Sequence, residues 1–222
     1  MNNIFNYDNA FFRGMNKVMD AFFASALWLV FCLPVITIGA STTAFYYTVH
    51  KSVCGNRGYV WQSFWSSFKS NFKQTTKIWL IQAVMFAFLA ADRHIMEVYL
   101  EQGSKLGVLY YVFHFLILFW AVWCVYTFTY SARFENGMRD TMKNAAVIAV
   151  LNLPWSLLIL GLLIGAGFVI YLFPIYLLPI IIVAVPAGLA VLYDTCLEKV
   201  FRKYMSEEDL KKENEMNWER HY

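Results

Sequence analysis

The segment "NAAVIAVLNLPWSLLILGLLIGAGFVIYLFPIYLLPIIIVAVPAGLAVLY" (residues 144–193) contains no Asp, Glu, Lys, Arg or His. About 20 apolar residues suffice for a helix to cross a bilayer. A single helix over this whole segment would be about 75 Å long at 1.5 Å per residue, more than twice the thickness of the hydrocarbon layer. The segment must therefore turn back on itself, and the three glycines of "GLLIGAGF" (161–168) predict where it does so.

Three further uncharged runs precede this segment. They cover residues 21–49, 78–91 and 106–132, and the last includes His114. The chain is 59% hydrophobic and 15% charged, whereas an average soluble protein is about 25% charged. We therefore predict an all-α integral membrane helical bundle, with a single transmembrane domain over 1–198 and a charged cytoplasmic tail over 199–222. Five spans are expected, at about 19–42, 72–91, 106–131, 143–164 and 168–195.

The Lys and Arg residues fall unevenly on the two sides that five spans create. One side holds Arg13, Lys17, Arg93 and Lys105, and the other holds the remaining 14 of the 18. Cytoplasmic loops carry the excess of Lys and Arg. The sequence therefore predicts a multi-pass membrane protein whose N-terminus is outside and whose C-terminus is cytoplasmic, together with residues 50–71 and 132–142.

Proline and glycine interrupt several of the predicted spans. In "CLPVITIGAST" (32–42) we expect Pro34 to kink one continuous helix, with Thr37 helping to satisfy the distorted turn, and Gly39 to allow a close helix contact. Asn152 is expected to bond across helices near a second kink. The prolines predicted to kink the later spans are Pro154, Pro179 and Pro186.

Motifs of enzyme chemistry are absent from the sequence. There is no phosphate-binding glycine loop, no GxSxG turn and no HExxH pair. The four cysteines, at positions 32, 54, 124 and 196, do not have the spacing of a zinc site. We therefore expect no enzymatic activity, no catalytic residue, no cofactor and no metal.

Two polar features remain as weak candidates for a site. His94, Glu97 and Glu101 would share one face of a helix on the outer side, where they could hold a metal or polar ligand, although a solvated helix end is the favoured interpretation. His114 could contact a proton or a ligand within the third span. The favoured interpretation there is a neutral imidazole that bonds to a neighbouring helix.

The segment "WQSFWSSFKSNFKQTTK" (61–77) predicts an amphipathic cytoplasmic helix ahead of the second span. Lys69, Lys73 and Lys77 repeat every four residues, and large aromatic residues cover the adjoining face. One interpretation, the favoured one, is a helix in the headgroup layer attracted to anionic lipid. The other is a docking surface for a membrane subunit. The residues predicted to bind such a partner are Trp61, Phe64, Trp65, Phe68, Lys69 and Lys73.

The motifs "LPVITIGASTTAFYY" (33–47) and "SFKSNFKQ" (67–74) resemble the YesL-like family of small bacterial membrane proteins, most specifically over residues 33–47 and 64–74. The predicted kink at "LNLPW" and the proline-rich last span also match the layout of that family. The resemblance implies a bacterial cell-membrane protein of no known enzymatic activity that accompanies carbohydrate ABC importers. It therefore suggests an accessory subunit beside the permease chains of an importer.

Two other functions remain open on the sequence alone. A small stand-alone transporter or channel is less favoured, because few polar residues fall in mid-membrane. A membrane enzyme would have to use the cluster at 92–101. Nucleic-acid binding is not expected, because acidic and basic side chains balance in the tail.

Overall fold

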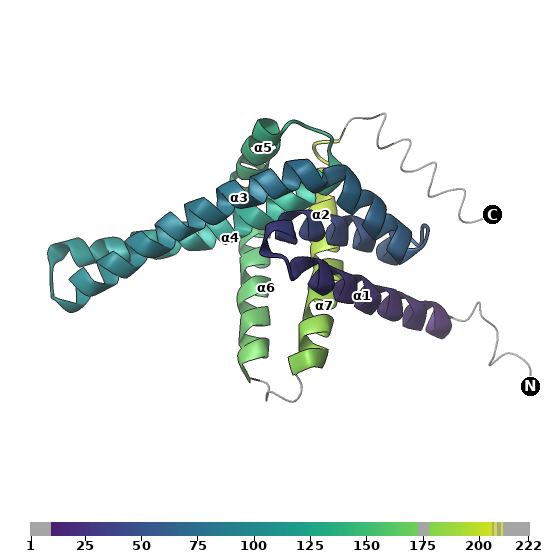
Figure 1. Cartoon of the computed structure of the whole chain (residues 1–222), viewed down its shortest axis with the longest axis horizontal. Coiled ribbons are helices and arrows are strands. Elements are labelled where there is room, and N and C mark those ends of the chain that lie inside the picture. Colours follow the sequence, from purple (N-terminus) through teal and green to yellow (C-terminus); the bar gives the residue numbers. More distant parts are fainter. Residues whose placement is uncertain (1–9, 173–177, 206, 208–209, 211–222) are drawn as a thin grey trace, which may run out of the picture.

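The computed structural model describes residues 10–172, 178–205, 207 and 210, and the regular elements within them are all helical (Figure 1). The predicted all-α class is therefore confirmed, whereas the tail from residue 211 onward lies outside the described residues. In chain order the elements are α1 (Ala10–Cys32), η1 (Val35–Thr37), α2 (Ile38–Thr48), η2 (Val49–Cys54), α3 (Val60–Glu101), η3 (Lys105–Val108), α4 (Leu109–Arg133), α5 (Met138–Leu151), α6 (Leu153–Leu172) and α7 (Leu178–Phe201).

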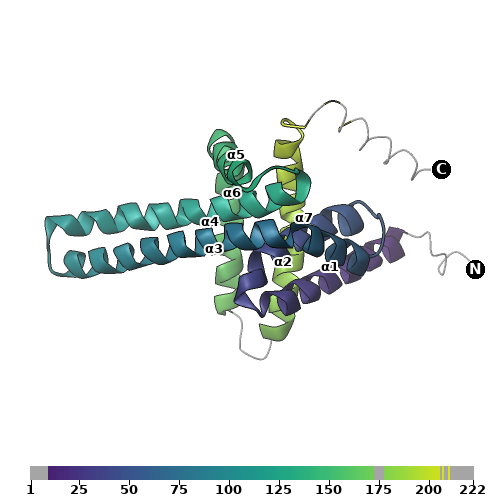
Figure 2. The same ribbon diagram turned by 45° about the horizontal axis from the view of Figure 1, so that its top comes forward.

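Three helical hairpins make up the described chain, formed by α1 with α2, α3 with α4, and α6 with α7. In Figure 1 the α3–α4 hairpin extends to the left and the α6–α7 hairpin runs downward. The α1–α2 hairpin lies along the first half of α3, and Figure 2 shows the same arrangement from a second direction. Helix α5 connects α4 to α6 at the end where the hairpins meet.

The prediction of one kinked helix over 19–42 is wrong, because the chain reverses direction between α1 and α2. The indole Nε1 of Trp28 donates to the hydroxyl of Thr42 at 3.2 Å, and the Ser41 hydroxyl donates to the carbonyl oxygen of Trp28 at 3.0 Å. Residues 13 positions apart in one helix would lie about 20 Å apart along its axis. Pro34 therefore stands at a reversal and not at a kink.

Side chains satisfy the backbone at this reversal. The Thr37 hydroxyl lies 2.6 Å from the carbonyl oxygen of Phe31 and 2.7 Å from that of Pro34. The indole of Trp79, on α3, donates to the carbonyl oxygen of Val35 at 2.7 Å. Gly39 meets α3 so closely that an added Cβ would lie 2.6 Å from the carbonyl oxygen of Thr75. The small residue at position 39 thus lets α2 approach α3.

The predicted span at 143–164 is also divided. Helix α5 ends at Leu151 and α6 begins at Leu153. Between them, the backbone amide of Asn152 donates to the carbonyl oxygen of Ile148 and closes the last turn of α5. The Asn152 side-chain amide donates to the carbonyl oxygen of Ile148 at 2.9 Å and reaches the Tyr204 hydroxyl near α7 at 3.1 Å. The break precedes Pro154 because a proline ring obstructs the preceding turn of a helix.

The glycine-rich turn predicted at 161–168 is wrong as well. Helix α6 continues through Gly161, Gly165 and Gly167 to Leu172, and the chain reverses only before α7. Helix formation in an apolar solvent satisfies every backbone group, which outweighs the weak helix propensity of glycine. Pro186 lies inside α7, whereas Pro179 falls among its first residues, whose side chains lie outside the described part.

Two apolar clusters hold the hairpins together. In the first, Phe31 of α1 packs against Phe64 and Phe68 of α3, with ring centroids 5.4 Å and 5.0 Å away. The second joins α4, α5 and α7 around Tyr126, Ile148 and Leu197. The first half of α3, which begins at Val60, therefore packs against the α1–α2 hairpin.

The molecule has the helices of a multi-pass membrane protein. Four described segments are long and apolar enough to cross a membrane: Gly14–Cys32, Val60–Glu101, Lys105–Arg133 and Leu153–Leu172. Apolar side chains such as Phe88, Phe115 and Leu157 are exposed on them, as expected of surfaces that meet lipid. The predicted fifth span, at 168–195, includes residues 173–177, which the structure does not describe.

Candidate functional site

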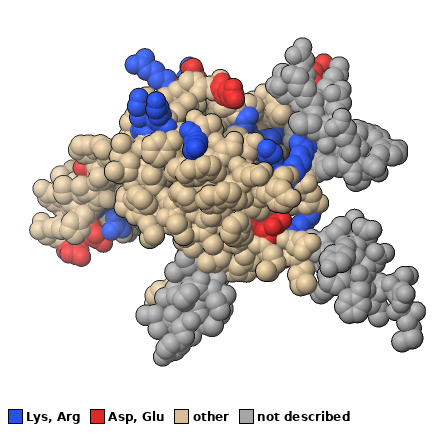
Figure 3. All heavy atoms as spheres, turned by 45° about the vertical axis from the view of Figure 1, so that its right-hand side comes forward, with Lys and Arg blue, Asp and Glu red and all other residues tan. Residues whose placement is uncertain are grey.

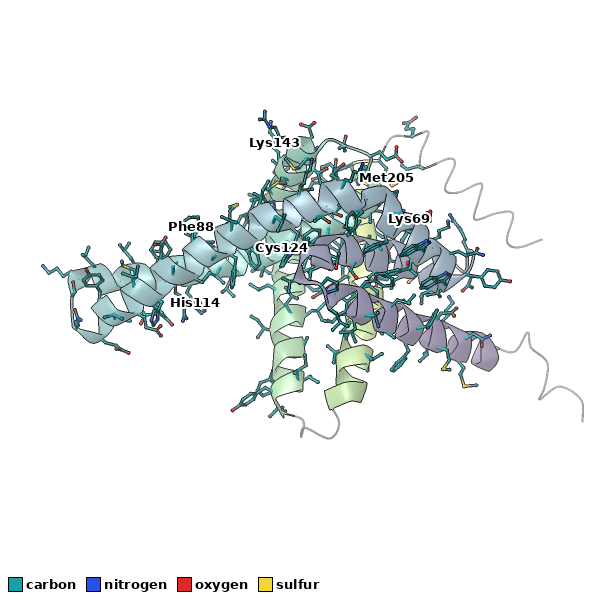
Figure 4. The ribbon with its side chains drawn as sticks, in the orientation of Figure 1. Lys69, Phe88, His114, Cys124, Lys143 and Met205 are labelled. Atoms are coloured by element: carbon teal, nitrogen blue, oxygen red, sulfur yellow. The ribbon has the colours of Figure 1, made fainter. Side chains whose placement is uncertain are left out.

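The most concentrated polar feature of the described chain is a junction of charged residues from three elements. His50 comes from η2, Arg133 is the last residue of α4, and Asp194 and Glu198 stand one turn apart on α7. Met205, labelled in Figure 4, also reaches this place, with its sulfur 3.6 Å from Arg133 Nη2. We refer to His50, Arg133, Asp194 and Glu198 as the polar junction.

A π-helical turn presents His50 to the polar junction. The amide of Gly55 donates to the carbonyl oxygen of His50 at 3.0 Å, five residues back in the chain. Such π-turns occur mostly as single interruptions in helices and are frequent at functional sites. The turn widens the end of the α1–α2 hairpin where it meets α7.

The hydrogen bonds fix the protonation of His50. Arg133 Nη1 lies 2.7 Å from His50 Nε2, and a guanidinium can only donate. Nε2 therefore accepts, and the ring proton is on Nδ1, which donates to Asp194 Oδ1 at 2.6 Å. His50 is neutral in this arrangement and links a cation to an anion.

Together with Arg202, the polar junction is balanced in charge. Arg133 Nη2 donates to both carboxylate oxygens of Glu198, at 3.1 Å and 3.0 Å, and Arg202 Nε donates to Glu198 Oε1 at 3.0 Å. Two guanidinium groups thus bind the Glu198 carboxylate, and the Asp194 carboxylate accepts from His50 beside them. Because Asp194 is buried, this pairing offsets the cost of removing its charge from water.

The neighbouring thiol is not a nucleophile in this setting. Burial and the Asp194 carboxylate, to which the thiol is hydrogen-bonded, raise the pKa of Cys54 to about 12. A reactive cysteine needs the opposite environment, in which cations stabilise the thiolate. The Cys54 side chain therefore stays protonated at neutral pH.

A metal ion fits the polar junction poorly. His50 Nδ1 and one oxygen each of Asp194 and Glu198 lie within 4.8 Å of one another, which is the spacing of a three-ligand site. Nδ1 carries the ring proton, however, so it has no lone pair to offer a metal while Arg133 donates to Nε2. The chemistry that the arrangement supports is a clamp, in which paired charges join the ends of three elements.

The sequence contains a signal for this junction that our predictions did not use. His50 directly follows the uncharged run 21–49, Arg133 follows 106–132, and Asp194 follows 144–193. Each is the first ionisable residue after an apolar run. Residues at such positions lie at a membrane surface, so helices that end on the same side can bring them together.

The polar residues predicted on the outer side do not form a three-ligand site. His94 Nδ1 lies 3.5 Å from Glu97 Oε2, but the His94 side chain is 76% exposed. Glu97 also binds Arg93, whose Nη2 is 3.3 Å away, and Glu101 is exposed. His114 lies exposed on α4, with its ring 6.0 Å from that of Tyr110 (Figure 4).

The predicted partner surface on α3 is only partly available. Phe64 is fully buried and Phe68 is 8% exposed, and both pack on Phe31. These two residues therefore belong to the core, and their assignment to a docking surface is wrong. The reason is that α1 turns back and covers them.

The remaining residues of that surface are accessible. Trp61 is 46% exposed and stacks on Trp65, with ring centroids 5.8 Å apart. The Nζ atom of Lys69 lies 5.0 Å from the centroid of the Trp65 ring, and Lys73 is exposed. Figure 3 shows Lys and Arg gathered across the upper part of the molecule, above a broad surface without charge.

Comparison with known families gives one match. A family model described as "Protein of unknown function, DUF624" matches residues 22–93. YesL is a member of that family, so the resemblance drawn from the sequence is supported at this coarser level. The matched region includes the second half of α1, all of α2 and most of α3. No curated protein and no solved structure matches the chain.

Proposed function

We propose that this protein is a non-enzymatic accessory membrane subunit that associates with the permease chains of a bacterial carbohydrate ABC importer. In this proposal the polar junction, residues 50–71 and the C-terminus lie on the cytoplasmic side of the cell membrane. The functional part of the proposal comes from the YesL-like resemblance. The membrane partner is suggested by a surface of the molecule itself.

That surface is the distal half of the α3–α4 hairpin, residues 80–101 and 109–120, which projects away from the other helices (Figures 1 and 2). Its exposed side chains are almost all apolar, as Phe88 and Phe115 illustrate. Ala83, Ala87 and Ala91 follow one another at intervals of four residues, and the last two are exposed. Small residues at this spacing let two membrane helices approach closely.

The accessible part of the predicted cytoplasmic surface supports the same proposal. Trp61 and Trp65 are aromatic residues of the kind that anchor interfaces, and Lys69 and Lys73 flank them. Both surfaces include residues of α3, so one partner could contact this helix at two places along its length.

In-membrane photo-crosslinking tests the proposal directly. A photoreactive amino acid at position 87 should form a covalent adduct with a permease chain in cells that are growing on the imported sugar. The same group at position 157 of α6, which is also exposed, serves as the matched control and should give no such adduct. Mass spectrometry of the adduct identifies the partner. The photoreactive amino acid is also placed at positions 61 and 91, on the two surfaces of α3. If it forms adducts only with lipid at positions 61, 87 and 91, the proposal is contradicted.

A stand-alone transporter is the second candidate, and the polar junction is the observation that favours it. Buried ionisable residues in membrane proteins often mark proton or ion pathways. In this structure both ring nitrogens of His50 are engaged, by Asp194 and by Arg133. Flux of a sugar or a proton into liposomes that contain only this protein would favour the transporter over the accessory subunit.

A further inference from the structure

One arm of the α1–α2 hairpin, α2, is too short to cross a bilayer, and the other, α1, reaches a spanning length only when the segment with Lys17 and Asp20 is included. The uncharged parts of the two arms, residues 21–32 and 38–49, contain 12 residues each and are about 18 Å long. The hydrocarbon core of a bilayer is about 30 Å thick. A hairpin of this length can enter one leaflet and leave by the same surface.

Between residues 21 and 49 the outer surface of the hairpin has no polar face. Ser25, Ser41, Thr43 and Thr48 are all buried, so the hydroxyl groups point into the molecule. The exposed side chains at the reversal are apolar, and include Leu33, Val35 and Ile36. A helix that lies at the water interface keeps a charged face toward water, and this part of the hairpin has none, because the exposed Asp20 of α1 lies outside it. Its surroundings are therefore acyl chains.

The backbone at the reversal is prepared for such surroundings. Irregular backbone at membrane depth requires hydrogen-bond partners from the protein. The Thr37 hydroxyl is within hydrogen-bond distance of the carbonyl oxygens of Phe31 and Pro34, and the Trp79 indole donates to the carbonyl oxygen of Val35. The reversal can therefore exist in lipid without water.

The proximal half of α3, residues 60–79, indicates which way the hairpin faces. The side of this helix toward the hairpin buries Phe64, Phe68 and Thr75, the last of which contacts Gly39. The opposite side of the helix exposes Lys69, Lys73 and Lys77. The lysines can reach anionic headgroups, and the hairpin then lies about 8–10 Å deeper, one helix diameter below.

We propose that the α1–α2 hairpin is embedded in the cytoplasmic leaflet without crossing the membrane, beneath the proximal half of α3. The first turns of α1 then lie on the same side as residues 50–57. Ala21 and Ala24 of α1 share a buried cluster with Val49 and Val53, so the N-terminal part of α1 lies at the end of the molecule that holds residues 50–57.

The distribution of charge agrees with this topology better than with an external N-terminus. Arg13 and Lys17 join the cytoplasmic side, which then holds 16 of the 18 Lys and Arg residues. Only Arg93 and Lys105, near the tip of the α3–α4 hairpin, remain outside. An excess of this kind on the cytoplasmic side is what membrane insertion requires.

Cysteine accessibility tests the inference. In a variant without the four native cysteines, single cysteines are introduced as Gly14→Cys, Tyr59→Cys and Gln102→Cys, all at exposed positions. With a membrane-impermeant maleimide, Gln102→Cys should react in intact cells, whereas Gly14→Cys and Tyr59→Cys should react only after permeabilisation. Reaction of Gly14→Cys together with Gln102→Cys in intact cells would show that α1 crosses the membrane. Reaction of Gly14→Cys and Tyr59→Cys but not Gln102→Cys would assign the hairpin to the outer leaflet. Either result overturns the inference.

A depth measurement separates an embedded hairpin from one that lies on the surface. A fluorescent probe attached to Ile36→Cys in liposomes should be quenched by lipids brominated on their acyl chains and protected from aqueous iodide. The same probe at Tyr59→Cys should show the opposite pattern. Strong quenching of the position 36 probe by iodide would place the reversal in water and contradict the inference.

Discussion

The two halves of α3 both contain large aromatic side chains but differ in their surroundings. The proximal half, residues 60–79, buries Phe64 and Phe68 beneath the α1–α2 hairpin. The distal half, residues 80–101, leaves Phe88 68% exposed and contacts mainly α4. Large aromatic side chains thus form a core in one half and lie on an exposed surface in the other. The difference arises from a neighbouring hairpin and not from the helix itself.

The largest effect is expected from truncating one phenylalanine in each half. Phe64→Ala should lower the free energy of unfolding by about 3–5 kcal/mol, because it leaves a cavity among Phe31 and Phe68. Phe88→Ala should change it by about 0.5 kcal/mol or less, because that side chain is exposed. Unfolding of the purified protein in mild detergent measures both. Equal losses would mean that the two halves are packed alike.

The polar junction gives the second prediction, with two arginines that bind the same carboxylate. Arg133→Gln should destabilise the protein by about 3 kcal/mol, because it leaves Asp194, Glu198 and His50 without their central cation. Arg202→Gln removes a half-exposed partner of Glu198 and should cost about 1 kcal/mol or less. The unfolding assay compares them, and a larger loss for Arg202→Gln would contradict the proposed clamp.

Gly39 provides the third prediction, on the side of the hairpin that faces α3. Gly39→Ala should destabilise by about 1–3 kcal/mol, because the new methyl group would press on the carbonyl oxygen of Thr75 and on Trp79. Gly161→Ala, in α6, is the matched control: nothing lies within 4 Å of its added Cβ, and alanine favours a helix. A melting temperature for Gly39→Ala at or above that of the unsubstituted protein would show that the helices can separate there at no cost.

The sequence was sufficient to predict that the protein lies in a membrane and that its fold is all-helical. Uncharged runs such as 144–193 require a membrane helix whatever the tertiary structure is. The use of Thr37 at the distorted turn was also predicted from spacing alone, and its hydroxyl does lie on the carbonyl oxygens of Phe31 and Pro34.

The direction of the chain after each interruption could not be predicted in the same way. Pro34 and Pro154 both stand in uncharged runs, yet the chain reverses at the first and continues into a second helix at the other. The outcome depends on tertiary partners, such as Trp79 at the first break and Tyr204 at the second, which are 44 and 52 residues away. Because the reversal covers Phe64 and Phe68, the same uncertainty produced the wrong partner surface.

The smallest effect is expected from two indole hydrogen bonds, one in each half of α3. Trp79 Nε1 donates to the carbonyl oxygen of Val35 at 2.7 Å, and Trp120 Nε1 donates to that of Gln82 at 3.1 Å. Gln82 lies inside a long helix, where its carbonyl oxygen also accepts a backbone hydrogen bond. Val35 lies in a three-residue 3-10 turn, whose hydrogen bonds have poorer geometry. Trp79→Phe should therefore cost about 1 kcal/mol and Trp120→Phe less.

Hydrogen exchange can locate this small difference where a melting curve would average it. Peptides that cover residues 33–37 should exchange faster in Trp79→Phe, because the indole no longer holds the reversal against α3. They should keep their rate in Trp120→Phe, where the lost bond is in the distal half. If neither substitution changes exchange at 33–37, then Thr37 alone stabilises the reversal, and the proximal half of α3 contributes to the hairpin only through the apolar contacts of Phe64 and Phe68.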